Sequence, residues 1–549
     1  MDDFIFGFVA VDELKLNYHR LSCSGIQHNH ERSPRDPKPG QDVRLQVRVG
    51  PDLPIDHVAA YVTLDGSLPE GNRGEPENGF VVRFDRLEPE WDSLTWGYIS
   101  RWEAVLPAQP EGTVARYRIG GWRPDEPEIF ADWPDIKLST DRMTAAYYHD
   151  RSFEPVSIGD AAQGDVFSFH YDHLSPPAWA RESVIYHIFV DRFFPGQGRD
   201  WTQTSDLRAP FGGTLEGITE KLDYLEKLGT NCLWLSPIFP SPTVHGYDAV
   251  DISRVEERLG GDAALRSLVD EAHGRGMRII LDLVCNHISN QHPIFLDALK
   301  NKRSRYRNWF HFDDSAIGYR TFFGVPSMPQ LNLAVEGVRA WMIETARFWL
   351  REFNVDGFRL DHANGPGPGF WSDFWSACKS EKPESFCFGE MVEPADVLRR
   401  YTGCMDGALD FHFADALRRT YARQVWPKDK MLNFMSNHQA YFDPDFLMLT
   451  FLDNHDMDRF LYLAEGDQAR LRAAVEVQMR MPGPPVIYYG TEVGLNQQEG
   501  KSREIGLEAS RTEMIWGEEQ DRDLLEFYQG ALRGRKLARP WELKMVDSG

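Results

Sequence analysis

The sequence predicts a multidomain protein in which an all-β sandwich precedes a (β/α)8 barrel, the TIM-barrel fold. With 549 residues, of which 42% are hydrophobic, the chain is too long for one ordinary core and long enough for two or three domains. The first ~165 residues alternate apolar and polar positions, as half-buried strands do. Beyond them, short apolar runs alternate with amphipathic stretches, which is the rhythm of βα units.

The sandwich is predicted over residues 1–165. The alternation is clearest in three segments: residues 43–49, 58–64 and 114–119. Polar and Gly/Pro-rich loops separate them, as in sandwich folds. Trp91, Trp96 and Trp102 lie in this part of the chain and have two interpretations, a sugar-binding face or packing in a core or interface. Packing is the commoner role of such rings.

The barrel is predicted over residues 166–549. Eight segments are candidates for its parallel strands: residues 184–190, 232–235, 277–283, 357–360, 386–388, 407–411, 447–451 and 486–489. Residues 338–353 carry apolar side chains at three- and four-residue spacing, which predicts a helix with one face on the barrel. Before this helix, the chain makes a long excursion over residues 288–333.

Charge and composition limit the classes of partner. A formal net charge of −24 and a pI near 5.2 argue against nucleic acid and fit a neutral substrate. Residues 1–10 have acids where a signal peptide needs Lys or Arg, and no stretch is apolar and long enough for a bilayer. The six cysteines lack metal-ligand spacing. We therefore expect a cytoplasmic protein with reduced cysteines and neither a membrane nor a nucleic-acid partner.

Three acids stand at the ends of predicted strands, namely Asp361, Glu390 and Asp456. Each follows a short apolar run with a small or polar residue nearby, which is how a parallel barrel presents catalytic groups at its C-terminal rim. Retaining cleavage of a glycoside needs one carboxylate to attack the sugar carbon and a second carboxyl group to protonate the leaving oxygen. The sequence therefore indicates glycosidase chemistry.

Four motifs around these acids follow one another in a known order: residues 282–287, 357–361, 389–390 and 454–456. On these motifs the chain resembles the α-amylase family, glycoside hydrolase family 13, from about residue 181 to residue 539. Residues 328–332 resemble a fifth motif of the neopullulanase, cyclomaltodextrinase and maltogenic amylase branch, which usually has Lys where this chain has Gln330. The resemblance implies that residues 288–333 form a small inserted B domain that walls the cleft.

The resemblance also implies the catalytic roles. Asp361 is expected to be the nucleophile, and Glu390 the general acid and then the base. Arg359, two residues before Asp361 on the same strand face, supplies the cation that keeps Asp361 ionised. The neighbouring anions raise the affinity of Glu390 for a proton. Asp456 and His455 match the pair that hydrogen-bonds sugar hydroxyls as the ring flattens.

Four further residues are implied in substrate binding. Tyr247 matches the aromatic side chain that stacks on the sugar ring, and Asp248 follows it. His287 matches the histidine that holds the primary hydroxyl of the sugar. Asn364 lies three residues after the nucleophile.

The chain also departs from the branch. Gly365 stands where the branch carries a glutamate on the acceptor side, which leaves the preference between linkages open. Val392 replaces a tryptophan, so weaker stacking against the leaving group is expected. No cofactor is required by this chemistry, and calcium stays an open alternative with Asn286 as a weak candidate ligand. The β-rich C-terminal domain of the family is expected to be absent or lost by truncation, because the chain stops soon after residue 540.

Together these features predict a retaining hydrolase of α-1,4 linkages in maltooligosaccharides, cyclodextrins or related short glucans. A transglycosylase or a sucrose/trehalose-type isomerase is the enzymatic alternative, because it shares the covalent intermediate. A non-catalytic barrel, such as the ectodomain of an amino-acid transporter subunit, is disfavoured by the intact acids. In the resembling branch the N-terminal domain helps form a dimer and narrows access. We therefore expect a homodimer through this domain and a preference for short glucans over starch.

Overall fold

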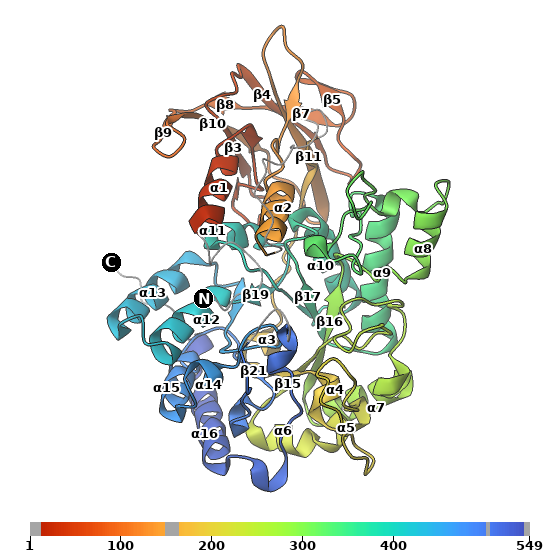
Figure 1. Cartoon of the computed structure of the whole chain (residues 1–549). Coiled ribbons are helices and arrows are strands. Elements are labelled where there is room, and N and C mark those ends of the chain that lie inside the picture. Colours follow the sequence, from red (N-terminus) through yellow and green to blue (C-terminus); the bar gives the residue numbers. More distant parts are fainter. Residues whose placement is uncertain (1–11, 149–163, 501–505, 543–549) are drawn as a thin grey trace.

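The computed structural model describes residues 12–148, 164–500 and 506–542. A β-sandwich lies at the top of Figure 1 and a (β/α)8 barrel below it. This arrangement confirms the predicted fold class.

Two antiparallel sheets form the sandwich. The first contains β1 (Ile26–Gln27), β3 (Val43–Val49), β10 (Gly97–Leu106) and β8 (Asp85–Arg86) in that order, with β2 (Arg32–Ser33) on β3 and β9 (Glu90–Asp92) on β10. The second contains β12 (Ile129–Phe130), β11 (Thr113–Trp122), β4 (His57–Thr63) and β7 (Phe80–Arg83), with β13 (Phe167–Tyr171) on β11. A separate ribbon joins β5 (Gly71–Asn72) to β6 (Glu75–Pro76). Alternate side chains of β3 point into the core, as its pattern predicts: Val43, Leu45, Val47 and Val49 are at most 1% exposed.

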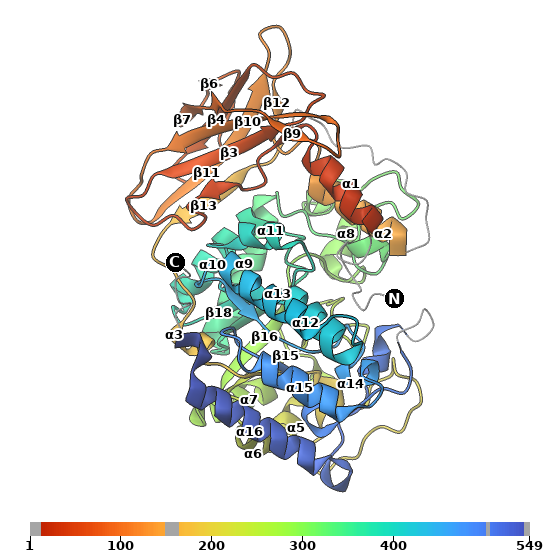
Figure 2. The same cartoon turned by 90° about the vertical axis from the view of Figure 1, so that its left-hand side faces the viewer.

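Two features of the N-terminal part differ from the prediction. β13 lies beyond the predicted boundary at residue 165 and yet pairs with β11, so the sandwich continues past that boundary. Two helices, α1 (Asp12–Ser22) and α2 (Ile136–Tyr148), accompany the strands and lie between the sandwich and the barrel (Figures 1 and 2). Asp135 caps α2 by accepting a hydrogen bond from the Leu138 backbone N–H at 2.7 Å.

Eight parallel strands form the barrel: β14 (Ile185–Ile188), β15 (Cys232–Leu235), β16 (Arg278–Val284), β17 (Gly357–Asp361), β18 (Phe386–Gly389), β19 (Gly407–Leu409), β20 (Leu447–Leu449) and β21 (Val486–Tyr488). All eight fall on the predicted segments. A parallel bridge between Thr450 and Pro485 joins β20 to β21 and closes the barrel. Large apolar side chains such as Trp234, Phe388 and Leu449 fill its interior.

Helices surround the barrel: α3 (Ala178–Arg181), α4 (Val190–Phe193), α5 (Leu215–Glu220), α6 (Leu222–Leu228), α7 (Gly261–Gly274), α8 (Pro293–Lys300), α9 (Glu336–Glu352), α10 (Pro368–Glu381), α11 (Ala395–Leu398), α12 (Phe411–Leu417), α13 (Lys428–Tyr441), α14 (Phe460–Leu463), α15 (Gln468–Gln478) and α16 (Arg522–Ala538). α9 is the helix predicted over residues 338–353, and its Val338, Met342 and Trp349 are fully buried.

The predicted excursion over residues 288–333 contains α8 and two short 3-10 turns, η3 (Arg307–Trp309) and η4 (Phe322–Gly324). An antiparallel bridge between His287 and Gln330 closes its base. Packing of Phe295 against Phe310, with ring centroids 4.9 Å apart, gives it a small apolar centre. Since η4 contacts α2, the excursion and the N-terminal domain meet over the barrel rim.

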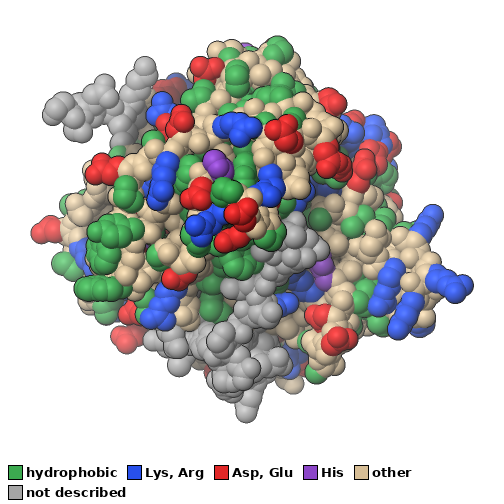
Figure 3. All heavy atoms as spheres, turned by 90° about the horizontal axis from the view of Figure 1, so that it is seen from above, with side chains coloured by type: hydrophobic (Ala, Val, Ile, Leu, Met, Phe, Trp, Pro, Cys, Tyr) green, Lys and Arg blue, Asp and Glu red, His purple; other side chains and the backbone are tan. Residues whose placement is uncertain are grey.

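Figure 3 looks onto the N-terminal domain, where acidic and basic side chains mix and hydrophobic ones gather at the left edge, the side of β9 in Figure 1. Trp91 (45%), Trp96 (78%) and Tyr98 (65%) are exposed on the β9–β10 hairpin, whereas Trp102 is buried in the sandwich core. Each of the two interpretations therefore suits some of the tryptophans. Trp102 packs in the core, whereas Trp91 and Trp96 are exposed and accessible to a partner or a sugar.

All six cysteines are buried and free of disulfides, which fits their prediction as reduced core residues. Among the described helices, none combines the length and the hydropathy needed to cross a bilayer. The cytoplasmic location stays a prediction.

Candidate active site

Three acids stand at the C-terminal rim of the barrel, each after a different strand. Asp361 ends β17, Glu390 directly follows β18, and Asp456 lies in the loop after β20. The Glu390 backbone N–H donates to the carbonyl of Leu360, and the Ala363 N–H donates to the carbonyl of Glu390, each at 2.9 Å. These bonds continue the β17–β18 pairing and hold Asp361 and Glu390 beside each other.

One buried guanidinium joins three carboxylates at this rim. Arg359 Nη1 donates to Asp361 Oδ1 at 2.7 Å and to Asp282 Oδ1 at 2.8 Å. Its Nη2 lies 2.7 Å from Glu390 Oε2, an ion-pair contact without hydrogen-bond geometry. Arg359 therefore offsets the negative charge of these three carboxylates, including that of Asp361, the predicted nucleophile.

Burial sets the protonation of the two central acids. It raises the pKa of Glu390 to about 7, while Arg359 opposes the rise and the charge of Asp456 adds to it. Burial also raises the pKa of Asp361 well above its ordinary value, against the pull of Arg359 and with a contribution from the charge of Glu390. Because burial raises both pKa values and the charge of Glu390 further raises that of Asp361, the pair holds a proton near neutral pH.

Asp456 belongs to a second polar group on the same rim. Arg511 donates to Asp456 Oδ1 at 2.7 Å and to the backbone carbonyl of His455 at 2.8 Å. His455 Nε2 lies 3.1 Å from Asp456 Oδ2 and 2.5 Å from the hydroxyl of Tyr247. The Tyr247 hydroxyl also donates to Asp282 Oδ2 at 3.1 Å. Tyr247 and His455 thus connect the two polar groups.

The histidines of this rim are neutral. Burial and the charge of Arg511 lower the pKa of His455 well below its ordinary value. Burial lowers the pKa of His287 to about 3, against a small opposing effect of the Tyr247 backbone. His287 Nδ1 lies 3.2 Å from Asn286 Nδ2. Neutral imidazoles beside the site suit hydrogen bonds to uncharged sugar hydroxyls.

Asn286 is the weak candidate for a calcium ligand. Its side-chain oxygen accepts a hydrogen bond from Gln330 Nε2 at 3.0 Å, so one of the two lone pairs of this oxygen is already engaged. Within residues 12–148, 164–500 and 506–542, the one group of three or more His, Cys, Asp or Glu side chains close enough to share an ion lies in the N-terminal domain.

Asp248, the residue after Tyr247, is buried and bonded within its own loop. It accepts hydrogen bonds from Ser241 Oγ at 2.6 Å and from the hydroxyl of Thr243. These bonds fix the loop that carries Tyr247. The contact of Asp248 with substrate stays a prediction.

Asn364 pairs with an acid that the motifs did not single out. Its Nδ2 donates to Glu393 Oε1 at 2.6 Å, and Glu393 is 9% exposed, three residues after Glu390. At Gly365, where the branch carries its glutamate, an added Cβ would lie 2.2 Å from Asn286 Oδ1. The side chains of Asn286 and His362 therefore leave no room for a side chain at position 365, and the carboxylate on this side comes from the neighbouring loop.

These loops border a cavity of 720 Å³ between the sandwich and the barrel, here called the interdomain chamber. Asn364 and Glu393 line its barrel wall, and Lys137 of α2 and Tyr18 of α1 line its opposite wall. Its volume falls in the range of about 300–1,000 Å³ that ligand pockets occupy. Burial and the charge of Lys137 lower the pKa of His362, so α2 lies near the residue that follows the nucleophile.

Sequence reasoning missed Arg511 and Glu393. Arg511 lies 55 positions after Asp456 in the chain and belongs to no local pattern. Glu393 did have a signal, because parallel pairing of β17 with β18 brings the loops after Asp361 and Glu390 together.

A closed parallel barrel with three carboxylates and a buried arginine at its C-terminal rim has the architecture of a barrel glycosidase. Comparisons with known proteins agree. The family profile described as "Alpha amylase, catalytic domain" matches residues 187–533. The chain therefore belongs to the α-amylase family, as its motifs predicted.

Three relatives show the similarity in detail. Alpha-amylase 2 of Dictyoglomus thermophilum is 40% identical over 368 residues, which cover 66% of this chain and 65% of the relative, slightly less than two thirds of its length. Neopullulanase 2 of Thermoactinomyces vulgaris is 34% identical over 420 residues, covering 71% of this chain and 69% of the relative. A cyclomaltodextrinase structure matches with a TM-score of 0.63 and 27% identity over 93% of this chain and 84% of that chain.

Proposed function

We propose that the chain is a retaining α-glucan hydrolase that cleaves α-1,4-glucosidic bonds of maltooligosaccharides and cyclodextrins. The observation that carries the proposal is the placement of Asp361 and Glu390 on adjacent strands around Arg359, with the pKa of Glu390 raised to about 7. One carboxyl group is then ionised and the other protonated at neutral pH, as a double displacement requires. Relatives named amylase, neopullulanase and cyclomaltodextrinase support a glucan substrate.

In the first step, an oxygen of Asp361 attacks the anomeric carbon while the glycosidic C–O bond breaks. The proton of Glu390 passes to the leaving oxygen. In the second step, Glu390 takes a proton from water, and the water oxygen displaces Asp361 from the same carbon. Two inversions restore the starting anomer. Asp456 and His455 hold hydroxyls of the sugar as its ring flattens, and the ring of Tyr247 stacks on it.

The interdomain chamber is assigned to the leaving-group sugars. Glu390 must reach the leaving oxygen, so the residues that follow it face the leaving group. Glu393 and Asn364 stand there and line the chamber. Because α1 and α2 of the N-terminal domain form the opposite wall, a long polymer has little room on this side, which favours short glucans and cyclodextrins over starch.

Product analysis tests this function. Incubation with maltotriose, β-cyclodextrin, pullulan and sucrose is expected to release reducing ends from the first two substrates and to leave sucrose unisomerised. NMR of the first product is expected to show the α-anomer. Longer oligosaccharides without a gain in reducing ends would indicate a transglycosylase instead, isomerised sucrose an isomerase, and a first-formed β-anomer would refute the retaining mechanism.

Turnover is further proposed to need no calcium, because the Asn286 oxygen already accepts the Gln330 hydrogen bond. Dialysis against EGTA is expected to leave kcat/KM on maltotriose unchanged. A loss of activity that added Ca²⁺ restores would contradict this proposal.

A further inference from the structure

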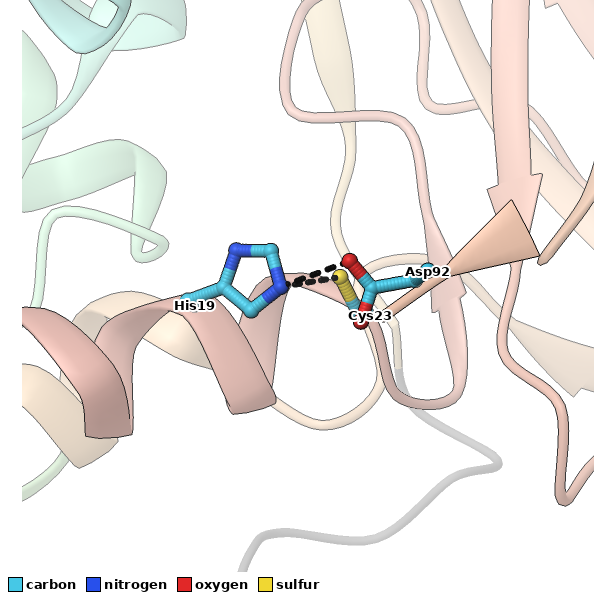
Figure 4. A group of neighbouring side chains, drawn as sticks. All are labelled: His19, Cys23 and Asp92. Carbon is cyan, nitrogen blue, oxygen red and sulfur yellow. Dashed lines mark hydrogen bonds and ion pairs between the residues drawn. The ribbon is translucent and has the colours of Figure 1, made fainter. Parts of the chain in front are cut away.

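A cluster of ligand-type side chains lies in the N-terminal domain, outside the candidate active site. His19 lies in the last turn of α1, Cys23 directly follows this helix, and Asp92 ends β9 (Figure 4). Their potential ligand atoms all lie within 4.8 Å of one another. Cys23 is 5% exposed, and the side chains of His19 and Asp92 are 35% and 14% exposed. The cluster is thus half-buried, with one side open to solvent.

The backbone places the three groups on a common centre. His19 and Cys23 are four residues apart, and the Cys23 N–H donates to the His19 carbonyl at 3.1 Å, so both side chains lie on one helical face. Asp92 Oδ2 accepts hydrogen bonds from the backbone N–H and the hydroxyl of Thr95, at 2.6 and 2.7 Å. This support directs the other oxygen, Oδ1, at His19. Carboxylates oriented by such hydrogen bonds are typical of metal sites.

One nitrogen of His19 faces both other groups. His19 Nε2 lies 2.9 Å from Asp92 Oδ1 and 3.6 Å from Cys23 Sγ. A neutral imidazole nitrogen has either one hydrogen or one lone pair. His19 Nε2 can therefore form a good hydrogen bond with Asp92 Oδ1 or with Cys23 Sγ, but not with both at once. A cation at the common centre would satisfy all three atoms at once.

The two separations measured from His19 Nε2 fit a tetrahedral ion, and the ligand atoms of Asp92 and Cys23 lie within 4.8 Å of each other. With metal bonds of about 2.0 Å to nitrogen and oxygen and about 2.3 Å to sulfur, tetrahedral angles place N and O about 3.3 Å apart and N and S about 3.5 Å apart. The separations in this cluster, 2.9 and 3.6 Å, differ from these values by a few tenths of an ångström. A nitrogen and a sulfur ligand favour zinc over calcium or magnesium, which prefer oxygen.

We propose that His19, Cys23 and Asp92 bind one zinc ion, with water in the fourth position. On binding, the thiol of Cys23 loses its proton to solvent and its sulfur bonds to the metal. The ion would join the end of α1 to the β9–β10 hairpin. Tyr18, the residue before His19, lines the interdomain chamber. The metal would therefore fix one wall of that chamber while remaining separate from the catalytic acids.

Cobalt titration tests the proposal. Tag-free full-length protein, first stripped of metal, is titrated with Co²⁺, which gives a thiolate charge-transfer absorption when bound to Cys. The expected result is this absorption at about one equivalent per chain and its loss on addition of Zn²⁺. Zn²⁺ is also expected to raise the Tm of the wild-type chain.

Variants locate the site. Cys23→Ser is expected to abolish the absorption, and His19→Gln and Asp92→Asn to weaken Zn²⁺ binding by roughly tenfold or more. Asp92→Asn keeps an oxygen for Thr95, so the hairpin is retained, and circular dichroism checks the fold. Glu90→Gln, an exposed acid on the same strand, is the matched control and is expected to bind like the wild type. Absence of the absorption in the wild type, or its persistence in Cys23→Ser, would overturn the proposal.

Discussion

At the residue scale, the charge balance around Arg359 governs the chemistry. Its guanidinium faces Asp282, Asp361 and Glu390, so three ionised carboxylates and one cation would leave a net charge of −2 in a buried site. Isolated buried charge is costly, and one bound proton relieves much of that cost. Asp361 receives a hydrogen bond of 2.7 Å from Arg359, whereas Arg359 meets Glu390 only as an ion pair and the other donor to Glu390 is the His362 backbone N–H, at 3.2 Å. The proton therefore belongs on Glu390.

The pH dependence follows from this placement. A carboxyl group with a pKa raised to about 7 is protonated, and able to act as an acid, below that pH. We expect kcat/KM for maltotriose to fall as the pH rises through about 7.

The charge of Asp456 raises the pKa of Glu390. Asp456→Asn, assayed on an activated maltosyl fluoride, is therefore expected to move the alkaline limb of the pH profile, the fall in kcat/KM near pH 7, to lower pH. An unmoved limb would show that another group titrates.

Removal of either reacting group is expected to stop turnover without unfolding the chain. Asp361→Asn lacks the attacking anion and Glu390→Gln lacks the proton, so each is expected to lower kcat by about 10⁴-fold or more on maltotriose. Glu384→Gln, an exposed residue shortly before β18, is the control and is expected to retain wild-type rates. Activity above about a tenth of the wild-type value in either active-site variant would refute the role assigned to that residue.

At the element scale, the loops after β17 and β18 are the elements proposed to bind the leaving group. Glu393 and Asn364 form a buried pair on these loops. If they bind leaving-group sugars, Glu393→Gln is expected to lower kcat/KM for maltotriose about tenfold, the worth of one charged hydrogen bond. Cleavage of p-nitrophenyl maltoside, whose leaving group has no sugar hydroxyls, is expected to change little. Both rates are measured at saturating and limiting substrate.

The matched control is Asp396→Asn, which removes an exposed charge three residues further along the chain, in the first turn of α11. It is expected to leave both rates unchanged. Equal losses on the two substrates in Glu393→Gln would instead mean that Glu393 supports Glu390 structurally, and the assignment of the chamber to leaving-group sugars would fail.

The elements differ in how far the sequence could predict them. The eight barrel strands were predictable, because continuous apolar runs between polar turns are typical of strands covered on both faces. The sequence could show that Gly365 departs from the glutamate of the branch, but not that a side chain is sterically excluded there. The exclusion arises because a Cβ at position 365 would lie 2.2 Å from Asn286 Oδ1, which belongs to a distant segment of the chain. α2 was missed because its sequence, with two threonines, two tyrosines and a serine, has weak helical preference, and packing between the sandwich and the barrel compensates.

At the scale of the whole molecule, the exposed hairpin of the N-terminal domain is the surface best suited to self-association. Trp91, Trp96 and Tyr98 are exposed, and the ring of Trp91 contacts both others, with centroids 5.5 Å from Trp96 and 5.0 Å from Tyr98. Trp96 has a φ of 56°, in the left-handed region that is unfavourable for a non-glycine residue. Exposed aromatic clusters of this kind often anchor interfaces.

We therefore predict that the protein forms a homodimer through this hairpin, and that Trp96→Ser combined with Tyr98→Ser shifts it to monomer in light scattering. Two copies with a formal charge of −24 repel each other, and because salt screens that repulsion beyond about 8 Å, association is expected to strengthen from low to physiological salt. Leu432→Ser, which alters a similarly exposed apolar residue on α13 of the barrel, is the control. If dimerisation narrows access, the double variant also loses part of its preference for β-cyclodextrin over soluble starch. A wild-type chain that is monomeric at every salt concentration, with similar specific activity on both substrates, would contradict the prediction and leave α1 and α2 as the sole restriction on substrate size.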